Sequence, residues 1–193
     1  PADVRAEAAE EEAAFGGAID FGAFPEFLLF QIGAPYQLGE VFVDQVVRSG
    51  GERAVDGALV DPPDTSEQFL FFERYQPRDP RVEVPPPPAD GEVVEDGVIG
   101  ALFLFGLFTT GDTTINEADA VRAVEGWGGD WAVTWRDGDA NCFRADFVGD
   151  TAEDTAELGA ALEIWSSDAE IGTVTEVDGR IRLESCVAGA DPV

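Results

Sequence analysis

Hydrophobic and polar residues recur with two different periods along this chain of 193 residues. Over residues 1–125 the apolar positions return every three to four residues, which is the period of a helix that packs on one side. Over residues 126–193 apolar and polar residues alternate in short runs, as is typical of half-buried strands. The pattern predicts an α+β protein with a mainly helical N-terminal section packed against a small C-terminal section, as two parts or as one continuous domain.

Helices are expected wherever the longer period holds, with glycine or proline at their ends. The best one runs from Tyr36 to Ser49 and ends at Gly50-Gly51, and Gly33-Ala34-Pro35 is expected to separate it from the helix before it. Ser66 and Asn116 are candidate N-cap residues. The expected helices are Val4–Ala14, Glu26–Ile32, Tyr36–Ser49, Glu52–Leu59, Val98–Phe108, Asn116–Glu125 and Asp150–Ser166.

Residues 76–90 contain the run Pro85-Pro86-Pro87-Pro88, which neither a regular helix nor a central strand accommodates. We therefore expect an extended, polyproline-like strap that lies over the surface.

The C-terminal section is predicted to have the order ββαββ, with two antiparallel hairpins around one helix. Asp137-Gly138 and Asp178-Gly179 are the expected hairpin turns, because this dipeptide suits the tight turns that join two strands. The expected strands are Trp131–Trp135, Cys142–Val148, Ile171–Glu176 and Arg180–Cys186.

Acidic residues outnumber basic residues by 40 to 11, which gives a formal net charge of −29. Such a charge repels itself in the compact state, and salt screens that repulsion. We therefore expect a salt-loving host, although a GC-rich genome that favours acidic and arginine codons would give the same composition. Nucleic acids and anionic membranes bind clustered cations, so neither is an expected partner.

The sequence contains neither histidine nor lysine, and this removes several classes of chemistry. Hydrolases with an imidazole base, zinc sites built from imidazoles, Schiff-base enzymes and the lysine of a P-loop are all excluded. No glycine-rich dinucleotide motif follows a strand. We expect no cofactor, no metal site and no catalytic residue in this chain.

Carboxylates are the remaining candidates for chemistry. Paired acidic residues can hydrolyse glycosides, but 40 of them place such pairs together by chance. The run from Asp137 to Asn141 copies the first half of a calcium loop, yet Cys142 and Val148 stand where the loop needs glycine and glutamate. We interpret this run as a hairpin turn, and weak cation binding to the acidic surface remains open.

Four tryptophans, Trp127, Trp131, Trp135 and Trp165, could form a platform for sugar rings. Their positions beside a strand and on the inward face of a helix favour packing in the core instead.

Glu67, Arg74 and Tyr75 share one short segment and are expected to form a buried polar network. We interpret this network as structural rather than catalytic, because an arginine–carboxylate pair can hold the segment on the core.

Cys142 and Cys186 are the two cysteines of the chain. An even number in a chain of secreted character predicts one disulfide, and free buried thiols are the alternative. The longest apolar run, Val98–Phe108, is too short to span a membrane. Since the chain lacks methionine, we expect Pro1 to be a processed or cut terminus rather than a translation start.

An ordered series of short motifs resembles the C-terminal part of secreted, zincin-like lipoproteins of bacteria and haloarchaea, and it covers nearly all of the chain. The motifs are Tyr36-Gln-Leu-Gly39-Glu-Val-Phe42-Val43, Gly50-Gly51, Pro62-Pro63, Ser66-Glu67-Gln68, Gly126-Trp127-Gly-Gly-Asp130, Trp135-Arg-Asp-Gly-Asp139 and Cys142 through Asp150-Thr151.

The chain also departs from that family. The family's zinc site lies in an upstream His-Glu-x-x-His helix and a later glutamate, and this chain has neither. Where the family usually carries Val-Leu-His-Pro after the Glu-Gln pair, this chain has Phe69-Leu70-Phe71-Phe72. No zinc ligand or catalytic glutamate can therefore be transferred to any position here.

Two functions are consistent with these observations. The first is a non-catalytic extracellular or cell-surface module on a zincin-derived scaffold, which binds an unknown protein or surface partner or serves a structural role. The alternative is the C-terminal portion of a secreted zinc metallopeptidase whose catalytic helix lies outside this chain. An apolar groove or aromatic patch left uncovered on the helical section would favour the first.

Overall fold

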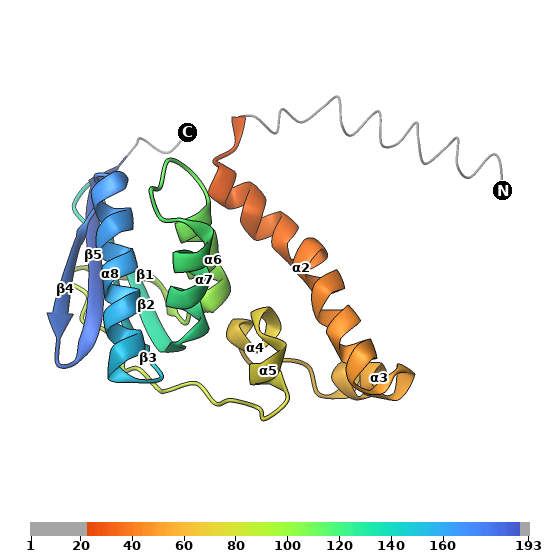
Figure 1. Cartoon of the computed structure of the whole chain (residues 1–193). Helices are drawn as coiled ribbons and strands as arrows, with labels where there is room; N and C mark the ends of the chain where they lie inside the picture. The colour runs from red at the N-terminus through yellow and green to blue at the C-terminus, as the bar shows by residue number, and fades with distance from the viewer. Residues whose placement is uncertain (1–22, 190–193) are drawn as a thin grey trace.

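A five-stranded antiparallel sheet with helices on one of its faces forms the centre of the molecule (Figure 1). The computed structural model describes residues 23–189, so the helix expected over Val4–Ala14 lies outside the described residues. Neighbouring strands follow the order β1-β2-β3-β5-β4. The strands are β1 Glu92–Gly97, β2 Trp127–Asp137, β3 Ala140–Gly149, β4 Thr173–Val177 and β5 Arg180–Ala188.

The helices form two layers over the same face of the sheet. In the inner layer α6 and α8 pack on the strands and α7 packs against both of these helices, and the outer layer, α2 and α4, packs on α6 (Figure 1). The helices are α2 Glu26–Gly50, α3 Glu52–Val60, α4 Ser66–Leu70, α5 Phe72–Tyr75, α6 Gly100–Thr109, α7 Glu117–Glu125 and α8 Ala152–Asp168. None of the helices in the described part of the chain is long and apolar enough to cross a membrane.

The main core lies between the sheet and the inner helices. Alternation along β3 turns Ala145 and Phe147 toward the helices and Arg144 and Asp146 toward the opposite face. The largest fully buried apolar side chains of this core are Trp127, Phe108, Phe147, Leu104, Leu158 and Leu162. Their burial is the main source of stability, because removing apolar surface from water is the dominant favourable contribution to folding.

The structure confirms the α+β class, with helices first and strands later. β2 and β3 form the first hairpin and β4 and β5 the second, with α8 between them. Asn116 caps α7 as predicted, because its side chain accepts a hydrogen bond from the Asp119 amide at 3.0 Å. α4 differs by one residue: Thr65 rather than Ser66 is its N-cap, and its hydroxyl accepts from the Gln68 amide at 3.1 Å.

The predicted break at Gly33-Ala34-Pro35 is wrong, since α2 continues through Pro35 without interruption. A proline inside a helix removes one backbone hydrogen bond and crowds the preceding turn. Tertiary packing on both sides outweighs that cost, because Phe27 contacts Phe103 of α6 and Phe42 contacts Phe69 of α4. Both halves of α2 are therefore held on the same outer layer.

β1 was not expected from the sequence. Half of the residues in Glu92–Gly97 are charged and nearly all are exposed, so they lack the alternation that predicts a strand. They pair with β2 as an edge strand, with Val93 opposite Trp135 and Asp96 opposite Val133. The sheet therefore takes one strand from within residues 1–125.

The proline-rich strap connects α5 to β1 across the face of the sheet opposite the helices. The Val82 amide donates a hydrogen bond to the Gly128 carbonyl at 2.6 Å, and the strap residue Val84 is buried. A Cβ atom at Gly129 would collide with the Val82 carbonyl oxygen, so glycine is required where the strap crosses β2.

Candidate functional site

Cys142 and Cys186 form a disulfide, with a sulfur–sulfur distance of 2.04 Å. They lie directly opposite one another on β3 and β5, although 44 positions separate them in the sequence. The disulfide is confirmed, and the alternative of free buried thiols is wrong.

The structure brings Glu67 and Arg74 together in a group that we call the Arg74 cluster, which consists of Arg74, Glu67, Asp79 and Asp150. The Arg74 guanidinium lies 3.9 Å from Glu67, 2.6 Å from Asp79 and 3.0 Å from Asp150. It also donates a hydrogen bond to the Glu125 carbonyl at 3.0 Å. One arginine thus ties the α4–α5 segment to the end of α7 and to the turn after β3.

The carboxyl group of Glu67 is a weak acid in this setting. Its residue is only 3% exposed, and burial together with the nearby charge of Asp150 raises its pKa to about 8, while Arg74 opposes the shift. Burial also raises the pKa of Asp150. Glu67 therefore holds its proton at neutral pH, and its Oε1 atom has no hydrogen-bond partner. So little exposed surface leaves a substrate no access to this carboxyl group.

Tyr75 contacts a different set of groups from Glu67 and Arg74. Its hydroxyl donates a hydrogen bond to the Asp61 carbonyl at 2.8 Å, and its ring lies 5.1 Å from the ring of Phe42 in α2. The Arg78 guanidinium stacks on the ring at 4.2 Å. Tyr75 thus fastens α2 and the loop after α3 to α5, and forms no hydrogen bond with Glu67 or Arg74.

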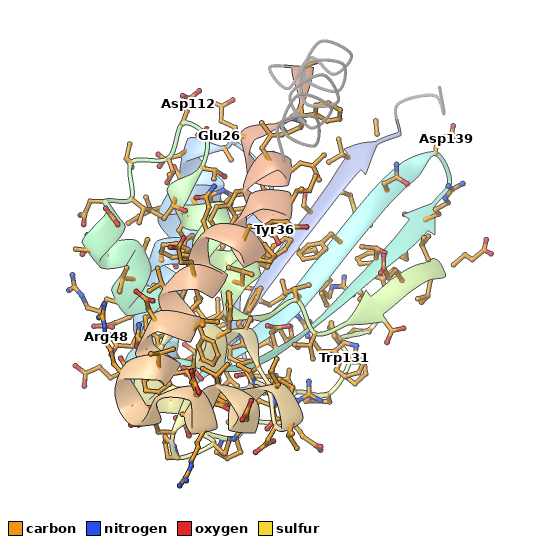
Figure 2. The ribbon with its side chains drawn as sticks, turned by 90° about the vertical axis from the view of Figure 1, so that its right-hand side faces the viewer. Glu26, Tyr36, Arg48, Asp112, Trp131 and Asp139 are labelled. Atoms are coloured by element: carbon orange, nitrogen blue, oxygen red, sulfur yellow. A yellow bond between two sulfur atoms is a disulfide. The ribbon has the colours of Figure 1, made fainter. Side chains whose placement is uncertain are left out.

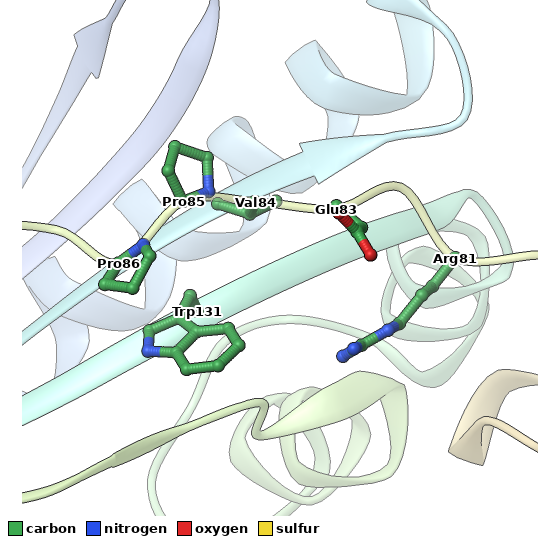
Figure 3. A pocket seen from close by; sticks show the side chains of 6 residues that line it. All are labelled: Arg81, Glu83, Val84, Pro85, Pro86 and Trp131. Carbon is green, nitrogen blue, oxygen red and sulfur yellow. The ribbon is translucent and has the colours of Figure 1, made fainter.

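The four tryptophans divide between core and surface. Trp127 and Trp135 are almost fully buried, and Trp165 packs against the main core. Trp131 instead lines a hollow of about 350 Å³ beside the strap (Figure 3). The side chains of Arg81 and Glu83 reach from the strap toward the same space as the indole ring. The indole Nε1 donates to Asp96 at 3.1 Å, which fixes the orientation of the ring.

Asp130 is a buried carboxylate that the sequence did not single out. It is 2% exposed and accepts hydrogen bonds from the amides of Ile99 and Gly100 and from the indole of Trp127, each at 2.8 Å. Burial raises its pKa, while these three hydrogen bonds oppose the shift. Asp130 therefore supplies acceptors to the first amides of α6. A polar residue within an apolar strand was the only available signal.

Arg144 is a second buried charge that the sequence did not reveal. Its guanidinium pairs with Glu184 at 2.7 Å and Asp90 at 2.8 Å, and it donates to the Pro88 carbonyl. It also stacks over the ring of Trp135 at 4.8 Å. Arg144 holds the end of the strap on the sheet. The alternation along β3 predicts that Arg144 points away from the helices and into solvent. The strap covers that face, and nothing in the sequence of β3 indicates this.

The outer side of α2 carries an uncovered apolar face, which Figure 2 views with Tyr36 labelled. Tyr36 is 81% exposed and Ile32 is 61% exposed. Successive members lie three or four residues apart, so they fall on one side of the helix. We call this surface the α2 outer face, and its residues are Leu28, Ile32, Tyr36, Gly39, Val43 and Val47.

Comparison of the chain with models of known protein families, with curated proteins and with solved structures gives no match. The resemblance to zincin-like lipoproteins therefore stays a prediction. The geometry of the described residues alone carries the functional argument.

Proposed function

We propose that this chain is a non-catalytic binding or structural module of the cell exterior, built on a zincin-like scaffold, and that it contacts its partner through the α2 outer face. The single observation that carries the proposal is the apolar character of that face along a helix of 25 residues.

Exposed apolar residues are ordinary when they are scattered, but a contiguous patch indicates an interaction site. The members of the α2 outer face follow one another along five turns of helix, and Glu40 and Asp44 lie along the edge of this strip. Elsewhere the chain has 40 acidic residues to cover its surface. A continuous apolar strip on so acidic a protein is costly to leave in water, which favours a partner that covers it.

The buried ionisable groups support binding rather than catalysis. Glu67 and Asp130 are the buried carboxylates whose pKa values are raised, and both are 3% exposed or less. The Asp130 carboxylate accepts hydrogen bonds from the start of α6 and from Trp127, and Glu67 lies beside Arg74. Perturbed carboxylates indicate a catalytic site when they face a cleft, and these two face the protein's own backbone and side chains.

The disulfide supports a location outside the cytoplasm, because disulfides persist in oxidising compartments. The acidic surface fits a saline medium in which counterions screen the repulsion among carboxylates.

Hydroxyl-radical footprinting tests the proposed contact surface. The native source material and the purified, dilute protein are oxidised in parallel, and modification of Ile32 and Tyr36 is compared with that of Ile164. Ile164 is a matched control because it is 45% exposed on α8, at a distance from α2 in sequence and fold. We expect strong protection of Ile32 and Tyr36 in the native material and none of Ile164. Equal oxidation in both samples would contradict the proposal.

The α2 outer face is also consistent with the metallopeptidase alternative, since an additional domain of a longer native chain could pack on it. The intact mass of the native protein separates the two functions. A mass that matches residues 1–193 favours the stand-alone module, and a longer chain with a His-Glu-x-x-His helix favours the peptidase.

A further inference from the structure

We infer that the occupant of the α2 outer face is a second copy of this chain, so that two α2 helices pack antiparallel about a two-fold axis between Tyr36 and Gly39. This inference rests on the proposed function and names the partner of the same surface.

The spacing of the face is the first argument, because it reads the same from either end of the helix. Leu28, Ile32 and Tyr36 follow one another at intervals of four, and Gly39, Val43 and Val47 do so as well, with an interval of three between the two sets. An antiparallel two-fold axis places Leu28 opposite Val47, Ile32 opposite Val43 and Tyr36 opposite Gly39. An isologous interface requires such self-complementarity, since each copy contributes the same patch.

Side-chain size is the second argument. The face pairs its largest residue, Tyr36, with its smallest, Gly39, at the position nearest the axis. A Cβ atom at Gly39 would meet nothing within 4 Å, so no contact within the chain requires glycine there. Glycine inside a helix is less favourable than alanine. Nothing within the described part of a single copy of the chain therefore explains why position 39 is glycine. The ring of Tyr36 from a second copy would occupy the space that Gly39 leaves.

Charge is the third argument. α2 begins with Glu26 and carries its only basic residue, Arg48, in its last turn. Antiparallel packing brings the acidic end of one copy beside the basic end of the other, and it also sets the two helix dipoles side by side in opposite directions.

The available area fits a weak, specific dimer. At roughly 200 Å² per large side chain, the exposed fractions of the face correspond to on the order of 500 Å² per copy. Two copies would bury about 1,000 Å², which is the lower limit for a specific interface. The remaining charge of −29 per copy opposes association in dilute buffer, and salt relieves this repulsion. The dimer should therefore strengthen as salt concentration rises.

Sedimentation velocity of the full chain over a range of protein and NaCl concentrations tests the inference. We expect a dimer at about 100 µM protein in molar salt, and association at least about tenfold weaker in dilute buffer. The Gly39→Gln variant should weaken the dimer by at least about tenfold, because the new side chain occupies the space that the Tyr36 ring of the second copy would fill. Gly57→Gln is the matched control, since Gly57 lies inside α3 and also has nothing within 4 Å of an added Cβ.

A second pair of variants does not depend on added bulk. Tyr36→Gln should weaken the dimer to a similar extent, and Val41→Gln, at another exposed apolar position on α2, should leave it unchanged. Circular dichroism confirms that each variant keeps its helices. A chain that stays monomeric in molar salt, or a dimer indifferent to Gly39→Gln and Tyr36→Gln, overturns the inference. If the chain is monomeric but Tyr36 is still protected in the native material, the inference of a second copy is overturned and the proposed binding function stands.

Discussion

The carboxylate of Asp130 lies 2.8 Å from the indole Nε1 of Trp127, and both side chains are buried in the core. The same carboxylate accepts hydrogen bonds from the first amides of α6, so one side chain joins β2 to the helix that packs on it. This contact aligns two elements that α7 and its flanking loops separate in the sequence. Its removal is the most direct test of how the sheet and helices are held together.

Asp130→Asn should lower the free energy of unfolding by about 2–4 kcal/mol, because the amide nitrogen cannot accept a hydrogen bond and faces buried donors. Urea denaturation at fixed salt concentration measures the change. Asp96→Asn is the matched control, since Asp96 accepts from Trp131 at an exposed position and should change stability by less than about 1 kcal/mol. Equal effects of the two substitutions would refute the capping role.

Glu67 predicts a specific pH dependence of stability. Its pKa in the folded protein is about 8, above the ordinary value of 4.5, so between these values the folded state binds the proton more tightly than the unfolded state. Stability from this group is therefore lost as pH rises from about 4.5 to 8, with a limiting slope of about 1.4 kcal/mol per pH unit. Below and above this pH window, titration of Glu67 causes no further change in the free energy of unfolding.

Glu67→Gln removes that dependence. The variant should match the wild type near pH 4.5 and exceed it above pH 8 by up to a few kcal/mol, because glutamine has no charge to bury. Denaturation curves at several pH values across the window measure the difference. Glu73→Gln, at an exposed position on α5, serves as the control. A difference from wild type that stays constant with pH would show that Glu67 is already ionised in the fold.

Reduction of the Cys142–Cys186 disulfide should destabilise the protein by about 2–4 kcal/mol, because the bond closes a long loop in the unfolded chain. Thermal denaturation with and without a reductant measures the loss. The Cys142→Ala/Cys186→Ala double variant should melt at one temperature in both conditions. Stoichiometric thiol labelling of the native, unreduced protein would be incompatible with the disulfide.

The net charge predicts that the melting temperature rises from dilute buffer to molar salt. The control is the same comparison near pH 4.1, the isoelectric point, where little net charge remains to be screened. The rise should shrink there. A melting temperature that is independent of salt at neutral pH would remove the argument for a saline environment.

Much of the fold followed from local patterns. The two hairpins, α8 and the N-cap at Asn116 were predictable because strand alternation, Asp-Gly turns and capping residues act within a few positions of one another. The errors arose where distant contacts decide the outcome. α2 passes through Pro35 because aromatic residues of α4 and α6 hold both halves, and β1 exists only because β2 supplies its partners.

The candidate sites show the same division. Glu67 and Arg74 were expected together because they share a segment, but Asp79 and Asp150 join them through the fold alone. Asp130 and Arg144 were not recognised, since the α6 amides lie at least 30 residues from Asp130 and the partners of Arg144 lie 40 to 56 residues from it in the chain. The apolar members of the α2 outer face were visible as hydrophobic residues, but only the packing of α2 on one side leaves them uncovered.

The disulfide also determines how the molecule would respond to mechanical force. Cys142 and Cys186 lie on adjacent central strands, and α8, β4 and most of β5 belong to the segment between them. A pull on the two chain ends would pass from β3 to the end of β5 through the sulfur–sulfur bond, so this segment would bear no tension. Stretching should extend the elements that precede Cys142, from α2 through β2, and then stop, with about 44 residues never extended.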